Sequence, residues 1–343
     1  MQQFYDHLEI SPIELPFPVA RRNPRAGRAD VETRRWLYDK GLLRSPAARR
    51  RCVHQNYGSL MAYAYPRATR ESLALCQKWL TIGFFFDDIC TEGDPSPGEM
   101  HSAVARIAET LESGSVVGGR SDGPCLRALA ELRQVTLAGR SPAWCDRFLR
   151  NALDFYEGFL EEFRNQTAGS AGSIGDYIAL RRKTVGMTHA FDLMEIAERT
   201  ELPERLYDCP EWAGLRDATI DVIAYINDIL GLQKELIHGE VNNLVLVIEN
   251  SAAVDRAEAV ARARALLESR LADYLRLEQS LPEAFARLEL GGTVEAGARR
   301  CVAGYRDWMA GYLHWHLSET SRYEGAGKAS SQELSCLENM MGA

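Results

Sequence analysis

The sequence lacks any long apolar run and any excess of positive charge. Its apolar stretches, such as Leu244–Ile248, fall far short of the ~20 residues that cross a bilayer. The 343 residues carry 40 Lys and Arg against 48 Asp and Glu, a formal net charge of −8. A nucleic-acid-binding protein usually concentrates positive charge, whereas the basic runs Arg49–Arg51 and Arg181–Lys183 are short. We therefore expect no membrane-spanning segment and no nucleic-acid partner.

Paired cysteines and a secretory leader are also lacking. The eight cysteines are scattered, without a C-x-x-C pair or a Cys/His cluster at zinc-site spacing. Isolated thiols in a reducing compartment behave as small apolar side chains, which predicts buried, free cysteines. The first residues, MQQFYDHLEI, have neither the basic nor the apolar region of a signal peptide, so a cytoplasmic location is expected.

Strand-like alternation is nearly absent, and apolar residues recur at the three- and four-residue spacing of helices. Ser96-Pro97 and Ser141-Pro142 supply the N-cap and first residue of two helices. Further predicted helices span 47–65, 71–88, 173–200, 210–238, 254–281 and 292–321, without a domain-separating linker. We expect one all-α domain, a helical bundle of residues 1–325, and a flexible polar tail at 326–343.

Three carboxylates gather where the predicted helix 71–88 ends. Asp87 and Asp88 are adjacent, and Glu92 follows Asp88 by one turn. The helix macrodipole disfavours anions at this end, so a cation should compensate them, and Mg²⁺ prefers carboxylate, water and phosphate oxygens. The alternative is a helix that simply ends in solvated acids, since acidic residues are common on protein surfaces.

A second polar stripe lies within the predicted helix 210–238. Asn227, Gly231 and Glu235 are spaced four and four, which places an amide oxygen and a carboxylate on one helix face with a gap between them. Apolar residues crowd both sides of this face, so an unused polar pair there would be costly. The alternative is an exposed stripe of an amphipathic helix.

These two segments resemble the aspartate-rich DDxxxE motif and the NSE motif of bacterial class I terpene synthases, also called terpene cyclases. Further segments follow the order of that family: Arg181–Thr184 before the second motif, Gly239–Val245 after it, and Arg322-Tyr323 near the end of the chain. Pro16–Pro18 and Tyr63–Pro66 also fit. The resemblance covers roughly residues 10–325.

The resemblance implies a helical bundle that ionises a linear isoprenyl diphosphate, releases diphosphate and cyclises the carbocation to a terpene. Three Mg²⁺ ions would lie between two walls, one with Asp87 and either Asp88 or Glu92, the other with Asn227 and Glu235. The diphosphate would accept hydrogen bonds from Arg181, which family register favours over Arg182, and from Lys234, Arg322 and Tyr323. Arg offers a planar fork to phosphate oxygens, Lys a point charge and Tyr a neutral donor.

A carbocation also needs apolar walls, aromatic faces and no water. Phe84 lies three residues before Asp87 and hence on the same helix face, where its ring would stabilise a cation by ~0.5–2 kcal/mol. Leu60, Trp308 and Trp315 are further candidates for lining the pocket, with ordinary helix packing as the alternative.

Two positions depart from the family pattern. Gly231 stands where the family usually has Ser or Thr as the middle metal ligand, and glycine costs ~1 kcal/mol in a helix relative to Ala. We expect a water in the vacated space to complete the Mg²⁺ shell. The pocket Trp that commonly lies six residues before the Arg is His316 here, with Trp315 one step earlier. Either the helix is over-wound there or His316 faces the pocket.

Two other functions share part of this pattern. A prenyl diphosphate synthase should show a second aspartate-rich segment, where this sequence has Asn227-Asp228 and Glu235. A non-catalytic helical lipid-binding protein would need neither metal wall. Chain length and motif layout favour farnesyl diphosphate as the substrate, with geranylgeranyl diphosphate as the alternative, and a homodimer is the family expectation.

Overall fold

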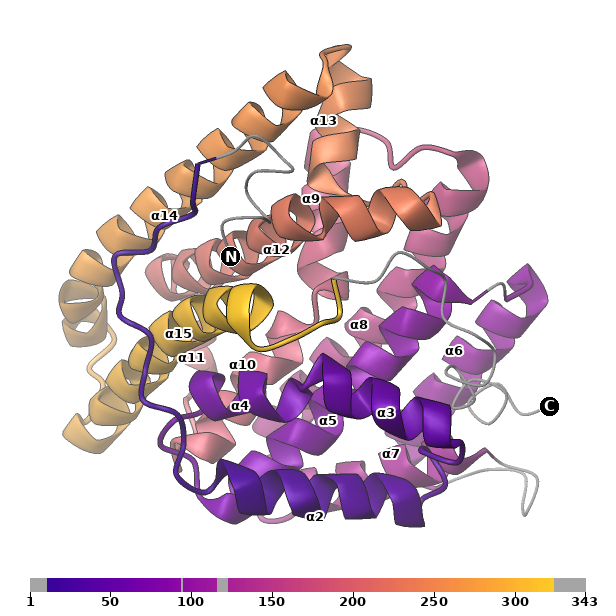
Figure 1. Ribbon diagram of the computed structural model, residues 1–343. Helices are drawn as coiled ribbons and strands as arrows, with labels where there is room; N and C mark the ends of the chain where they lie inside the picture. The colour runs from indigo at the N-terminus through magenta and orange to yellow at the C-terminus, as the bar shows by residue number, and fades with distance from the viewer. Residues whose placement is uncertain (1–10, 94, 116–122, 324–343) are drawn as a thin grey trace.

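The computed structural model describes residues 11–93, 95–115 and 123–323 (Figure 1). This part of the chain is helical and contains no strand, which confirms the all-α prediction. The helices are α2 (Ala26–Asp39), α3 (Pro46–Gln55), α4 (Tyr57–Ala64), α5 (Arg70–Glu92), α6 (Pro97–Ser113), α7 (Pro124–Leu137), α8 (Pro142–Ala168), α9 (Ile174–Thr184), α10 (Met187–Ala197), α11 (Glu204–Tyr207), α12 (Pro210–His238), α13 (Leu244–Ala252), α14 (Arg256–Arg287) and α15 (Gly292–Ser318). The predicted tail, 326–343, lies outside the described residues. Among the described helices, none is both long and apolar enough to span a membrane.

Several helix boundaries follow directly from local sequence signals. The Ser96 hydroxyl accepts a hydrogen bond from the backbone N–H of Glu99, and the Glu99 carboxylate accepts one from the backbone N–H of Ser96, at 2.8 Å. This reciprocal pair is the capping box of α6. Ser141 caps α8 by accepting from the backbone N–H of Trp144 at 3.2 Å. Helix α12 has the bounds that its periodicity predicts.

Two predicted helices are divided, so the expectation of continuous helices over 47–65 and 173–200 is wrong. Asn56, at a φ of 52°, separates α3 from α4, and Gly186, at a φ of 74°, separates α9 from α10. Both residue types tolerate the left-handed region. A break of one residue, as at Asn56, or of two, as at Val185-Gly186, leaves the apolar spacing on either side nearly intact, which explains why periodicity did not reveal it.

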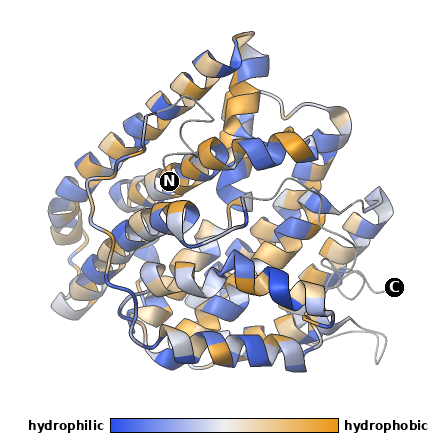
Figure 2. Ribbon diagram, in the orientation of Figure 1, coloured by the Kyte–Doolittle hydropathy of each residue, from blue (hydrophilic) through white to orange (hydrophobic). Residues whose placement is uncertain are grey.

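The helices pack so that six of them enclose one interior space. Helix α14 lies along α12, α15 lies against α4, and α2 lies against α5 (Figure 1). The segment before α2 crosses α14, where the Phe17 ring meets the edge of Tyr274 at a centroid distance of 5.6 Å. Apolar and polar residues alternate along most helices, in keeping with one covered and one exposed face (Figure 2). The described cysteines are free, as predicted, and all but Cys90 and Cys145 are buried.

Candidate active site

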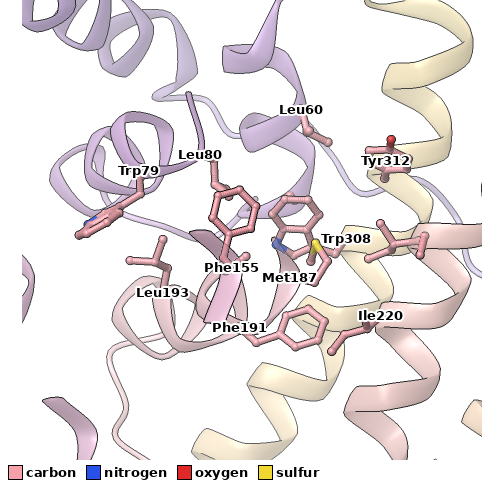
Figure 3. Close-up of a cluster of buried hydrophobic side chains, with 14 of the residues drawn as sticks. Leu60, Trp79, Leu80, Phe155, Met187, Phe191, Leu193, Ile220, Trp308 and Tyr312 are labelled. Carbon is pink, nitrogen blue, oxygen red and sulfur yellow. The ribbon is translucent and has the colours of Figure 1, made fainter. Parts of the chain in front are cut away.

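A large cavity lies between α5, α8, α9, α10, α12 and α15, and it contains about 1030 Å³ of space, counted with its open part. Its lining changes character along α5 and α12. We call one part the apolar end, which is lined by Leu80, Phe155, Met187, Ile223 and Trp308. The other part, the charged end, is lined by Asp87, Glu162, Arg181, Asn227, Lys234, Glu235, Glu240 and Arg322. Figure 3 shows Phe155, Met187 and Trp308 gathered at the apolar end.

One face of α5 supplies a wall of this cavity. Leu80, Phe84, Asp87 and Thr91 line it at spacings of four, three and four residues. This spacing keeps the four side chains on one helix face. Asp88 follows Asp87 by 100° of helix rotation and does not line the cavity. Asp87 is therefore the carboxylate of the first motif that faces the interior.

Asp88 and Glu92 instead face cationic side chains. Arg51 Nη2 lies 3.2 Å from Asp88 Oδ2 and 2.7 Å from Glu92 Oε1, and Lys234 Nζ lies 3.0 Å from Glu92 Oε1. Burial alone would raise the pKa of Asp88, but Arg322 and Arg51 lower it to about 2. The cations that offset these two acids thus come from the protein itself. Asp87 also pairs with Arg322, but it is the only one of the three that lines the cavity, which favours it as a metal ligand.

Arg322 contacts both the acids of the first motif and the aromatic side chains of Tyr57 and Phe84. Its guanidinium donates to Asp87, to Asp88 and, at 2.9 Å, to the hydroxyl of Tyr57. The guanidinium carbon lies 5.4 Å from the centroid of the Phe84 ring, and this ring stacks on Tyr57 at 4.2 Å. The side chain of Arg322 is only 3% exposed, so its charge acts inside the protein.

The second motif forms the opposite wall. Asn227 accepts a hydrogen bond from Arg181 and donates from Nδ2 to the hydroxyls of Tyr312 at 2.7 Å and Tyr323 at 2.9 Å. Arg181 also donates from Nε to buried Asp228 at 3.1 Å. Every polar atom of the Asn227 side chain is therefore placed by a residue from another segment.

Of the two neighbouring arginines, Arg181 lines the cavity and Arg182 does not. Arg182 Nε and Nη2 each lie 2.8 Å from an oxygen of Asp221, and Nη1 lies 2.8 Å from Asp217. This bidentate pair ties α9 to α12 behind the cavity wall. Arg181 thus belongs to the site, and Arg182 supports the wall behind it.

Glu235 is held by a residue that the sequence analysis did not single out. Asn243 donates from Nδ2 to Glu235 Oε2 at 2.6 Å and to the backbone carbonyl of Asp228 at 2.7 Å. Its side-chain oxygen caps α13 by accepting from the N–H of Val245 at 2.8 Å. Burial, reinforced by the charge of Asp228, raises the pKa of Glu235 to about 8. Asn243 lies in the segment that carries the family resemblance, but only the structure shows its contact with Glu235.

The space beside Gly231 is narrow, and a water that completes the metal shell there stays a prediction. A Cβ atom at Gly231 would lie 3.0 Å from Glu235 Oε1 and 3.5 Å from Cε1 of the Tyr323 ring. Protein atoms from the same helix and from the last described residue border this space. The glycine therefore allows a close approach between α12 and Tyr323.

The sequence analysis did not identify two carboxylates of the charged end as site residues. Glu162 on α8 and Glu240 after α12 both line the cavity. Burial raises the pKa of Glu162 to about 7, and burial together with Glu235 and Glu162 raises that of Glu240 to about 8. Glu240 falls within Gly239–Val245, so the family segment pointed to its neighbourhood. Glu162 looks like any polar helix residue, and no signal marked it.

The aromatic lining differs in part from the prediction. Phe84 and Trp308 line the cavity, and so does Tyr312, one turn after Trp308 on α15. Leu60 and Trp315 do not, because both are fully buried in the helix packing. Trp315 donates to the carbonyl of Asn56 at 3.0 Å, behind the rings of Phe84 and Tyr312.

His316 is the other candidate for the pocket position that a Trp commonly occupies in the family. It also lies outside the cavity lining. Its ring stacks on Tyr323 at a centroid distance of 3.7 Å, and burial lowers its pKa to about 3. Neither Trp315 nor His316 occupies the expected pocket position. The Tyr312 and Tyr323 rings cover both of them.

The charged end fits a hard metal ion in its donor chemistry. Asp87, Asn227 and Glu235 present carboxylate and amide oxygens from two facing walls, which are the ligands Mg²⁺ takes together with water and phosphate oxygens. Burial is the main cause of the raised pKa values of Glu235, Glu162 and Glu240, and neighbouring acids raise them further, so a cation bound at this end would favour their charged forms. Within the described ranges, no three His, Cys, Asp or Glu residues converge on one point. Ligands from both walls would have to share the ions with a substrate.

Comparisons with known proteins agree with this geometry. Residues 78–273 match the sequence profile of terpene synthase family 2, C-terminal metal binding. The chain is 30% identical to pentalenene synthase of Streptomyces exfoliatus, over 90% of this chain and 91% of that protein. It is 31% identical to a (−)-β-caryophyllene synthase of Saccharothrix espanaensis, which is described as (2E,6E)-farnesyl diphosphate cyclizing, over 86% of each. A solved structure of hedycaryol synthase superposes with a TM-score of 0.80 at 30% identity, covering 90% of this chain and 98% of that one.

Proposed function

The chain belongs to the bacterial class I terpene synthases, and from this premise we propose that it ionises farnesyl diphosphate and cyclises the carbocation to a sesquiterpene. The observation that carries the proposal is the division of one cavity into a charged end and an apolar end. Such a cavity can hold the diphosphate and the hydrocarbon chain of one substrate in different surroundings. The proposed catalytic domain is the single helical unit of residues 1–325.

Asp87 on one wall and Asn227 and Glu235 on the other would hold the metal, for which three Mg²⁺ ions remain our prediction. Asp88 and Glu92 are less suited to this role because they do not line the cavity and are paired with Arg51, Arg322 and Lys234. When bound, divalent ions supply electrostatic stabilisation of the negative charge on the leaving diphosphate.

Four donors at the charged end would bind the diphosphate: Arg181, Lys234, Arg322 and Tyr323. In the structure Arg181 and Tyr323 contact Asn227 and Arg322 contacts Asp87, so three of the donors lie beside a proposed metal ligand. Lys234 pairs with Glu92 instead. Charge-assisted hydrogen bonds from these groups would strengthen as the carbon–oxygen bond breaks, because charge accumulates on the leaving oxygen. Departure of the diphosphate is therefore the step that the charged end favours.

The apolar end would then fold and protect the carbocation. Phe155, Met187, Ile223 and Trp308 offer no strong nucleophile, and the Phe84 ring borders both ends of the cavity. An aromatic face stabilises a nearby cation by ~0.5–2 kcal/mol. Exclusion of water prevents early capture of the cation.

A fifteen-carbon substrate is supported by the caryophyllene synthase among the relatives, because its description specifies farnesyl diphosphate. Geranylgeranyl diphosphate is the second candidate. The prenyl diphosphate synthase and lipid-binding alternatives lose support, since the chain belongs to the terpene synthases and its second wall has Asn227-Asp228 and Glu235 in place of an aspartate-rich segment. A homodimer stays a prediction.

The deciding experiment incubates the protein with Mg²⁺ and, separately, geranyl, farnesyl and geranylgeranyl diphosphate. Diphosphate release is followed continuously, and the organic extract is analysed by gas chromatography with mass detection. We expect a cyclic C15 product from farnesyl diphosphate and none in excess EDTA. Chain elongation in a mixture of farnesyl and isopentenyl diphosphates would contradict the proposal, and so would a lack of diphosphate release from all three substrates.

A further inference from the structure

One titratable side chain reaches the cavity far from the charged end. His189 lies on the first turn of α10, lines the cavity and is 3% exposed. Its Nδ1 atom is buried and has no hydrogen-bond partner among the described residues. A buried polar atom without a partner costs ~1–3 kcal/mol. An imidazole that only packed in the core would be expected to have such a partner.

The surroundings of His189 are apolar. Its ring lies 5.2 Å from the ring of Phe155, and Gly186, at the break between α9 and α10, is its other close neighbour. Burial lowers the pKa of His189 to about 4, and no charged group contributes to this shift. The imidazole is therefore neutral near pH 7 and keeps a free electron pair. By contrast, the pKa values of Glu162, Glu235 and Glu240 all reflect neighbouring charges.

Ion pairs on the side of α10 away from the cavity fix the helix that carries His189. Arg147 on α8 donates from Nε to Asp192 at 3.1 Å and from Nη2 to Glu195 at 2.6 Å, and both acids lie on α10. None of these three charged residues lines the cavity. Helix α10 is thus anchored on its far side, and its first turn presents His189 and Met187 to the apolar end.

From this placement we propose that His189 is a catalytic base that ends the reaction by removing a proton from the last carbocation. The inference rests on the proposed function. A C–H bond next to the cationic carbon breaks, its electron pair forms the C=C bond of the product, and the proton goes to the free imidazole nitrogen. The charge of the cation thereby moves to an imidazolium. This group returns its proton to the released diphosphate or to water when the cavity empties.

Two substitutions separate a base from the other roles the residue could have. His189→Phe keeps an aromatic ring of similar size without a basic nitrogen. His189→Asn keeps a polar amide near the Nδ1 position, but an amide is a far weaker base. Thr188→Val, on the same turn of α10 but outside the cavity lining, is the matched control for a disturbance of this turn, because the Thr188 hydroxyl has no hydrogen-bond partner among the described residues.

We expect both His189 variants to release diphosphate from farnesyl diphosphate within about threefold of the wild-type rate. The main wild-type product should fall at least about tenfold, in favour of isomers with the double bond elsewhere. Catalytic hydrogenation of the extracts should then convert wild-type and variant hydrocarbons to the same saturated skeleton, because only the site of proton loss has changed. Thr188→Val should keep the wild-type double-bond position.

Each other result would overturn the proposal. If His189→Phe keeps the main product, the residue removes no proton; if His189→Asn alone keeps it, a polar contact suffices. Different skeletons after hydrogenation would assign the effect to cavity shape, and the same shift in Thr188→Val would assign it to a disturbance of α10. A wild-type product formed by water capture would also exclude this role. Wild-type protein that releases no diphosphate would instead refute the proposed function. Thermal unfolding of each variant shows that it is folded.

Discussion

The two ends of the cavity are built on different principles. At the charged end, most side chains are fixed by partners from other segments, as when Arg322 reaches Asp87 or Tyr323 reaches Asn227. At the apolar end, the lining side chains are held by packing, and the ion pairs of α10 lie on its far side. His189 is the one lining residue there whose side chain titrates, within the described part of the chain. We therefore expect the charged end to determine whether the substrate ionises and the apolar end to determine which product forms.

The largest effect should come from the metal ligands. Asp87→Ala and Glu235→Ala should each reduce diphosphate release below detection, because each removes an oxygen ligand that the transition-state charge depends on. Excess EDTA should do the same to the wild type. Asp217→Ala, at a half-exposed acid paired with Arg182 outside the cavity, is the control and should keep activity. Turnover that persists in either ligand variant would place the metals elsewhere.

The next effect concerns Arg181. Replacing it with Ala removes a charge-assisted donor to the leaving group, so diphosphate release should fall by ~10²–10³ with the product ratio unchanged. Arg182→Ala is the neighbouring control. It should lower thermal stability through loss of the Asp221 pair while turnover stays near wild type. If Arg181→Ala instead changes the products at a normal rate, the separation between the two ends fails.

Phe84 lies where the two ends meet, and its loss should act mainly on products. Phe84→Ala leaves the metal ligands in place, enlarges the cavity and removes a cation contact worth ~0.5–2 kcal/mol. We expect release of diphosphate within about tenfold of wild type and more acyclic or singly cyclised hydrocarbons and alcohols. Phe86→Leu, in the core beyond the cavity, should lower stability without this change. A preserved product pattern with a low rate would contradict the assignment.

The smallest effect is expected at Gly231. Gly231→Ala adds a Cβ that must displace Glu235 Oε1 by a few tenths of an ångström, since the two would be 3.0 Å apart. Gly231→Ser adds the same atom together with an oxygen that can ligate Mg²⁺. Both variants should remain within about tenfold of wild-type turnover, with Ser above Ala. Equal losses in the two would show that crowding alone matters, and the metal affinity measured by titration would then be unchanged.

The sequence was sufficient for the parts of this molecule that depend on local chemistry. Helix spacing, the Ser96 capping box and the two polar motifs follow from neighbouring residues, and they predicted the fold class and both walls. The breaks at Asn56 and Gly186 were missed because one left-handed residue does not disturb apolar spacing. Glu162, Asn243 and His189 were missed because their importance comes from what the fold brings beside them. Trp315 was misplaced because rings from three other segments cover it.

The closure of Tyr323 against Gly231 has a consequence for the timing of assembly. The N-terminus of a nascent chain leaves the ribosome first, and folding begins before synthesis is complete. Helices α5 and α12 are made early, but Arg322 and Tyr323 are translated more than eighty residues after Gly231. The protein therefore acquires these two donors only after α15, which supplies Trp308 to the cavity, has been made. A ribosome-bound chain that ends before α15 would lack both this wall and two of the four proposed diphosphate donors, so we expect it to form no reactive cation.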